Sequence, residues 1–161
     1  MRAMTHHDFQ TRRRAAKSLR QIKDPSASLA LVRSLNDWDP VLRETSSQAI
    51  VEFGDKQVVV PPLIRYLHSW KPSVRLHAAQ ILGEMGDPRA VEPLTRAFRR
   101  EPNDVTGHAM LEALKSLGAP VDAGWEELDR QRIQKGDERR AKDDAWRKKR
   151  KEQETKGKVQ Y

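Results

Sequence analysis

Apolar residues recur along this chain at helical spacing, in blocks about 32 residues apart. The third block contains two apolar stripes. The first consists of Val74, Ala78, Ile81, Leu82 and Met85, and the second consists of Ala90, Val91, Leu94, Ala97 and Phe98. Between them stands Gly86-Asp87-Pro88, where Gly suits a helix end and Pro suits the first turn of the next helix. Each block therefore predicts a helical hairpin.

Aligned copies share more than apolar positions. Arg75 aligns with Arg43 and Arg12, Leu94 aligns with Leu63 and Leu31, and Gly86-Asp87 aligns with Gly54-Asp55 and Lys23-Asp24. A weaker fourth copy runs from Gly107 to Leu128. We expect hairpins at about 8–37, 38–69, 70–101 and 102–132, which form one repeat domain over 1–132, and a basic charged tail over 133–161, either helical or disordered.

The third block, Val-Arg-x-x-Ala-Ala-x-x-Leu-Gly-x-x-Gly-Asp-Pro-x-Ala-Val-x-Pro-Leu, resembles HEAT repeats of the short prokaryotic type, also found in phycobilisome-lyase-like proteins. This resemblance implies an all-α, right-handed α-solenoid of about four helical hairpins, whose second helices line a concave face used mostly for protein contacts. A non-catalytic scaffold or adaptor is the function it favours. The family also includes nucleic-acid binders and bilin lyase subunits, so these stay as alternatives.

The net charge of +8 is concentrated at the carboxyl end. Residues 130–161 hold 13 Lys and Arg against 6 Asp and Glu, whereas residues 1–129 hold 18 against 17. A nearly neutral body with a basic tail favours a protein partner, best an acidic one, with nucleic acid as an alternative partner through the tail. Because no apolar run reaches membrane-span length and cysteine is absent, we expect a cytoplasmic protein without a membrane span or disulfides.

The inner arginines, Arg12, Arg43 and Arg75, fall in register with the apolar stripe of each first helix. A buried charge needs a partner, and the turn aspartates, Asp24, Asp55 and Asp87, repeat with the same period. The fourth copy has lost both, with Gly107 and Ala119 in their places. This joint loss favours structural Arg-Asp ion pairs over ligand binding.

The outer arginines, Arg33, Arg65, Arg96 and Arg130, each follow the core leucine of a second helix by two residues. An offset of two residues is about 200° around a helix, so these side chains should point away from the core. We expect them to form a ladder along the concave face that contacts a partner's carboxylates or phosphates. A solvated face that keeps the solenoid soluble is the alternative.

Two tryptophans, Trp38 and Trp70, occupy equivalent positions in the connections between hairpins. Packing over the edge of a layer is the interpretation we favour, and anchoring a partner is the alternative. In the tail, an accessory basic cluster comprises Arg147, Lys148, Lys149, Arg150 and Lys151. This tail cluster would contact a polyanion or serve as a solvated solubility segment.

Catalysis finds little support in the sequence. The histidines do not occupy matching repeat positions, and no nucleophile elbow or phosphate-binding glycine loop is present. We therefore expect no catalytic residue, no metal site and no cofactor. An enzymatic role as a bilin-lyase-like subunit rests on the family resemblance alone.

Overall fold

Helices account for all of the regular structure within residues 2–157, the part of the chain that the computed structural model describes. The α-helices are α1 (Phe9–Ile22), α2 (Ser28–Ser34), α3 (Pro40–Phe53), α4 (Lys56–Tyr66), α5 (Pro72–Met85), α6 (Val91–Arg100), α7 (Asp104–Ser116) and α8 (Ala123–Gly157). Short 3₁₀ helices lie at Arg2–Thr5, Pro25–Ala27 and Pro88–Ala90.

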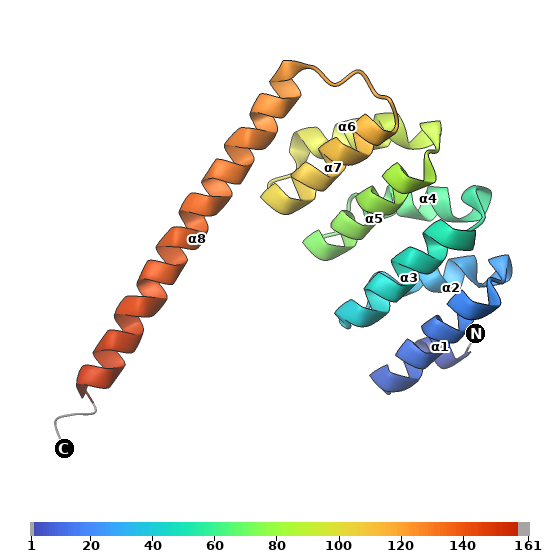
Figure 1. Cartoon of the computed structure of the whole chain (residues 1–161), viewed down its shortest axis with the longest axis horizontal. Coiled ribbons are helices and arrows are strands. Elements are labelled where there is room, and N and C mark those ends of the chain that lie inside the picture. The colour runs from blue at the N-terminus through green and yellow to red at the C-terminus, as the bar shows by residue number, and fades with distance from the viewer. Residues whose placement is uncertain (1, 158–161) are drawn as a thin grey trace.

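The helices stack in two layers (Figure 1). One layer holds α1, α3, α5 and α7, which contact one another in that order, and the other holds α2, α4 and α6. Each helix of the second layer also packs on the first helix of the next repeat. This arrangement confirms the predicted all-α solenoid of about four helical hairpins.

Small residues let the first helices approach closely. The backbone of α7 lies so near Gly83 of α5 that a Cβ added there would stand 2.8 Å from the Cα of Ala113. Ala78 and Ala79 on α5 are fully buried in the same core. Close backbone approach of this kind fixes how the repeats stack, because a larger side chain would force the helices apart.

The turns within the hairpins follow from capping chemistry. The turn aspartates Asp24, Asp55 and Asp87 each accept a hydrogen bond from the backbone N–H two residues further on, and so start the second helix of their hairpin. Gly86 ends α5 with a φ of +65°, a conformation that glycine adopts at little cost. Capping therefore makes each hairpin turn tight.

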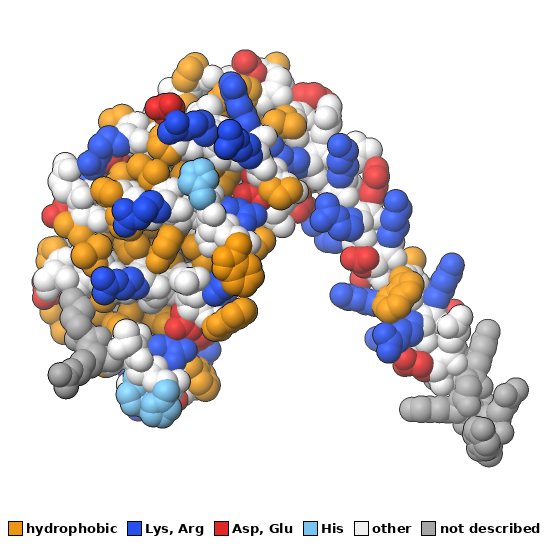
Figure 2. Space-filling view, turned by 180° about the vertical axis from the view of Figure 1, so that it is seen from behind, with side chains coloured by type: hydrophobic (Ala, Val, Ile, Leu, Met, Phe, Trp, Pro, Cys, Tyr) orange, Lys and Arg blue, Asp and Glu red, His pale blue; other side chains and the backbone are white. Residues whose placement is uncertain are grey.

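Helix α8 begins as the second helix of the fourth hairpin and continues far beyond it. Near its start, the ring of Trp125 stacks on Phe98 of α6 with centroids 5.6 Å apart. The part from 141 to 154 is exposed throughout and diverges from the stack, leaving the open space visible in Figure 2. The boundary expected between 132 and 133 lies inside this continuous helix. No helix within 2–157 is long and apolar enough to cross a bilayer.

Candidate functional site: the arginine face and the loop edge

The outer arginines lie exposed on the second-layer helices, with Arg33 on α2, Arg65 on α4 and Arg96 on α6. Leu31, Leu63 and Leu94, two residues before these three arginines, are fully buried, whereas Leu128 before Arg130 is partly buried. These side chains therefore point away from the core, as the helical offset predicts. Their proposed role in binding, and the concavity of this face, stay predictions.

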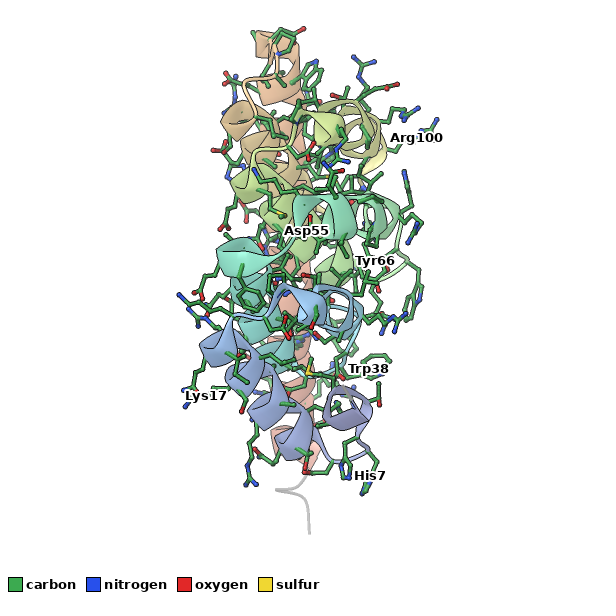
Figure 3. The ribbon with its side chains drawn as sticks, turned by 90° about the vertical axis from the view of Figure 1, so that its right-hand side faces the viewer. His7, Lys17, Trp38, Asp55, Tyr66 and Arg100 are labelled. Carbon is green, nitrogen blue, oxygen red and sulfur yellow. The ribbon has the colours of Figure 1, made fainter. Side chains whose placement is uncertain are left out.

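Two of the outer arginines lie close enough to Tyr66 to influence its hydroxyl. Burial raises the pKa of the Tyr66 hydroxyl, while the positive charges of Arg33 and Arg65 oppose that rise. Tyr66 lies on the same side of the stack as Trp38 and Arg100, opposite Lys17 (Figure 3). Within residues 2–157, no ion pair joins Arg33 or Arg65 to an acid, so both cations face solvent uncompensated.

The other outer arginines make only local ion pairs. Arg96 lies 3.4 Å from Glu92 on its own helix, and Arg130 lies 3.2 Å from Glu127 on α8. All four side chains are at least half exposed. Exposed pairs of this kind contribute little energy, so both arginines can exchange their acid for another partner.

A groove with a volume of about 870 Å³ opens beside Arg33. Its walls combine apolar side chains such as Met4 and Leu29 with His6, His7 and Trp38. An apolar groove with a few polar groups at its rim is the usual form of a ligand or side-chain pocket. The groove lies at the amino-terminal end of the outer arginine row.

The inner arginines share one geometry that the sequence did not predict. In each, Nη1 donates to two successive backbone carbonyls in the loop before its helix: to His6 and His7 from Arg12, to Asp37 and Trp38 from Arg43, and to Ser69 and Trp70 from Arg75. The six distances range from 2.7 to 3.2 Å. Arg43 and Arg75 thus clamp loops that join two repeats, and Arg12 clamps the segment that precedes the first repeat.

The acids that pair with the inner arginines come from the following loop and not from the hairpin turn. Arg75 makes a bidentate pair with Glu101, with distances of 2.6 Å from Nε and 2.7 Å from Nη2. Arg12 pairs with Asp37, which lies 2.8 Å from its Nε. The prediction that Asp24 or Asp87 fills this role is wrong, because the turn aspartates cap their helices. Asp87 also pairs with Arg89 in its own turn.

Arg43 differs from the other two inner arginines. Its guanidinium is half-buried, and its Nε, like that of Arg12, is buried without a hydrogen-bond partner. No ion pair joins it to a carboxylate in the described part of the chain, and the expected pairing with Asp55 does not occur. Its nearby positive charge also helps burial to lower the pKa of His77. Arg43 is therefore a cation whose structural acid is missing.

The two repeated tryptophans are exposed, which corrects the expectation that they pack over the edge. Trp38 is 80% and Trp70 is 78% exposed. The Nζ of Lys71 lies 4.2 Å from the ring centroid of Trp38 and 5.4 Å from that of Trp70. It also donates to the backbone carbonyl of Asn36 at 3.0 Å. We call Trp38, Trp70 and Lys71 the tryptophan edge. Figure 3 shows Trp38 standing out from the stack.

In the fourth repeat, Arg132 of α8 takes the space that an inner arginine fills elsewhere. A Cβ on Gly107 would stand 2.9 Å from Nη1 of Arg132, whose Nη2 donates to the carbonyl of Phe98 at 2.6 Å. Sequence reasoning missed this substitution because the guanidinium arrives from another helix. The available signal was the glycine at the position of the inner arginines, because a glycine leaves space there for a side chain from another helix.

The tail cluster on α8 is exposed along its whole length. Arg150 lies 3.0 Å from Glu154 and 5.5 Å from the ring centroid of Trp146.

One serine lies beside a histidine. Ser47 Oγ lies 3.3 Å from His77 Nδ1, but the same hydroxyl donates to the carbonyl of Arg43 at 3.0 Å. Within residues 2–157, no three His, Cys, Asp or Glu side chains gather as a metal site would require.

Comparison with known proteins places the repeats. The model for HEAT repeats matches residues 28–115, and the model for the PBS lyase HEAT-like repeat matches residues 11–37. A similar solved structure is a chain in the complex of CpcE and CpcF of phycocyanin lyase from Nostoc sp. PCC7120, with 28% sequence identity and a TM-score of 0.57. The match covers 73% of this chain and 51% of that one, so this chain spans about half of its relative's length. A search of curated proteins found no match.

Proposed function

The chain belongs to the HEAT repeat family, and we propose that it is a non-catalytic scaffold that binds a protein partner across its second-layer helices. The observation that carries this proposal is the row of exposed, evenly repeated outer arginines on α2, α4 and α6. Arginine suits such a surface because its planar guanidinium binds carboxylates through two parallel hydrogen bonds.

The groove beside Arg33 supports the same proposal. Protein interfaces draw most of their energy from a few anchoring side chains in apolar pockets, surrounded by polar contacts. Here Leu29 and Trp38 line a groove of about 870 Å³ at one end of the arginine row. An acidic partner segment with one large apolar side chain fits both features. Arg130 and the tail cluster on α8 would add accessory contacts.

A charge-reversal experiment tests the face. The variant carries Arg33→Glu, Arg65→Glu and Arg96→Glu, and partners are recovered with the tagged full chain and identified by mass spectrometry. A matched control reverses three exposed cations of the first layer, at Arg14, Lys17 and Lys115, so that net charge changes equally. We expect the control to retain the partner and the outer-face variant to lose it. Equal recovery by both variants would remove this face from the proposal.

A second candidate is a subunit of a two-subunit complex that acts on a bilin, favoured by the match to a chain of the phycocyanin lyase complex. A lyase subunit of this kind would still use its surface to hold another subunit, so both candidates require a protein contact. Absorbance titration of the purified chain with a free bilin separates them. A spectral shift at micromolar bilin favours the second candidate, and an unchanged spectrum leaves the scaffold.

A further inference from the structure

The three loops that join consecutive repeats place one side chain in an equivalent position. These side chains belong to Asp37, Ser69 and Glu101, which are 32 residues apart in the sequence. In each, a side-chain oxygen accepts the backbone N–H two residues further on, at 2.9, 3.3 and 2.9 Å. The shared hydrogen bond shows that the three positions are structural equivalents as well as sequence equivalents.

At two of the three positions a carboxylate neutralises the inner arginine of the preceding repeat. Asp37 does this for Arg12 and Glu101 for Arg75. Ser69 is too short and carries no charge, so the middle arginine, Arg43, keeps only its two loop carbonyls. A half-buried guanidinium without an acid is costly, because it loses hydration without gaining a counter-charge.

A second cation and two exposed rings lie in the two loops that flank the repeat of Arg43. The tryptophan edge lies in the same pair of loops, and Lys71 stands between its two indoles. Arg43 itself donates to the carbonyl of Trp38. Exposed tryptophans next to cations are typical of interface anchors, since each ring offers a large rigid area at a small entropy cost.

We propose that the tryptophan edge and Arg43 form a docking site for an acidic segment of a partner protein, whose Asp or Glu carboxylate supplies the acid missing at Ser69. The carboxylate approaches Arg43 and Lys71 while an adjacent apolar side chain covers the indoles. The acids that pair with the other two inner arginines, Asp37 and Glu101, are carboxylates. This favours an acidic peptide over a phosphate backbone as the partner of Arg43. Asp37 and Asp39 in the same loop as Trp38 also disfavour a continuous polyanion.

The tail cluster does not supply this acid from within the chain. Residues 147–151 of α8 are all basic, and the space-filling view shows open space between the end of α8 and the stack (Figure 2). The docking site lies on the loops and not on the outer arginine row. It shares Trp38 with the groove beside Arg33, but the charge reversal of the outer arginines and the variants of Ser69 change different residues, so they test the two proposals separately.

Indole N–H signals in a ¹⁵N correlation spectrum test the site directly. The chain has four tryptophans, so the spectrum contains few such signals, and single Trp→Phe variants assign each of them. The probe is a peptide of alternating Glu and Leu, and the control peptide carries Gln in place of Glu. We expect the signals of Trp38 and Trp70 to shift with the acidic peptide alone. Equal shifts with the Gln peptide, a response confined to Trp146, or no response at millimolar peptide would overturn the proposal. A stronger response to single-stranded DNA would overturn it in favour of nucleic acid.

A second variant restores the missing acid within the chain. Ser69→Glu should pair with Arg43 as Glu101 pairs with Arg75, raising Tm by about 2 to 4 °C and weakening the acidic peptide about tenfold. Ser69→Gln is the matched control, and we expect it to leave peptide binding within about twofold of the original. Unchanged peptide affinity in Ser69→Glu, or a Tm below that of Ser69→Gln, would show that Arg43 does not need a carboxylate.

Discussion

Replacing Arg75 by Ala tests the ion pair that joins the third and fourth repeats. The side chain of Arg75 is 12% exposed and that of Glu101 is 2% exposed, so both charges lie largely outside water. The hydrogen bond that Arg75 donates to Glu101 raises the pKa of Arg75, so the guanidinium is charged at every accessible pH. Truncation leaves Glu101 with the backbone N–H of Asn103 as a remaining donor. The buried carboxylate then lacks a counter-charge.

The expected cost follows from these contacts. Removing one partner of a fully buried pair costs about 3 to 5 kcal/mol. Arg75 is slightly exposed and Glu101 keeps one donor, which reduces the cost, while the loss of two carbonyl contacts adds to it. We expect Arg75→Ala to lower the free energy of unfolding by about 2 to 4 kcal/mol, and Tm by about 10 °C.

Two matched variants isolate the pair in thermal and urea unfolding. Arg43→Ala removes the same loop clamp at the equivalent position but strands no carboxylate, so it should cost less than Arg75→Ala. Arg96→Ala, at an exposed site, should change stability by about 0.5 kcal/mol or less. If Arg43→Ala or Arg96→Ala proved as destabilising as Arg75→Ala, the stranded carboxylate would not be the source of the effect.

Three further predictions concern packing, pH and the docking of α8. Gly83→Ala should destabilise by about 1 to 3 kcal/mol despite the better helix propensity of Ala, because its Cβ would meet the α7 backbone; a rise in Tm would contradict this. The hydrogen bond from Arg13 lowers the pKa of Asp39 below its ordinary value of 3.8, so its contribution is present above that pH and lost as pH falls through the folded pKa. Asp39→Asn should thus have a lower Tm than the original chain at pH 7, and its Tm should fall less than that of the original chain when the pH is lowered below 3.8. Gly136→Ala would place a Cβ against the carboxylate of Asp104 and should speed hydrogen exchange in α8 without unfolding α1 to α5.

Much of this fold was predictable because its stabilising features are local and repeated. The apolar stripe of α5, the glycine stop at Gly86 and the aspartate caps all act within a few residues, where sequence spacing fixes geometry. The exposure of the outer arginines followed from the same helical arithmetic. Each of these inferences needed only one helix or one turn.

The partners of the inner arginines were not predictable in the same way. Within a hairpin, an aspartate in the turn is nearer along the sequence, but its carboxylate is already engaged by the backbone it caps. The acid that an inner arginine meets lies 25 or 26 residues later, in a loop brought near only by stacking. Sequence period alone could have singled out Asp37 and Glu101, since they are two periods apart.

The two exposed tryptophans lie in the loops that join consecutive repeats. Each directly follows the position from which an acid can pair with an inner arginine. At Glu101 the loop has its acid, and Pro102 takes the position that Trp38 and Trp70 hold in the other two loops. The loop at Asp37 has its acid and an exposed indole as well. The loop with Ser69 lacks the acid and carries the exposed indole of Trp70 with Lys71 beside it. An acid at Ser69 would stabilise the repeat by pairing with Arg43, and the acidic partner segment that we propose would supply this acid from outside the chain. The surface of this solenoid is therefore most distinctive at Ser69, where the chain departs from the repeat pattern.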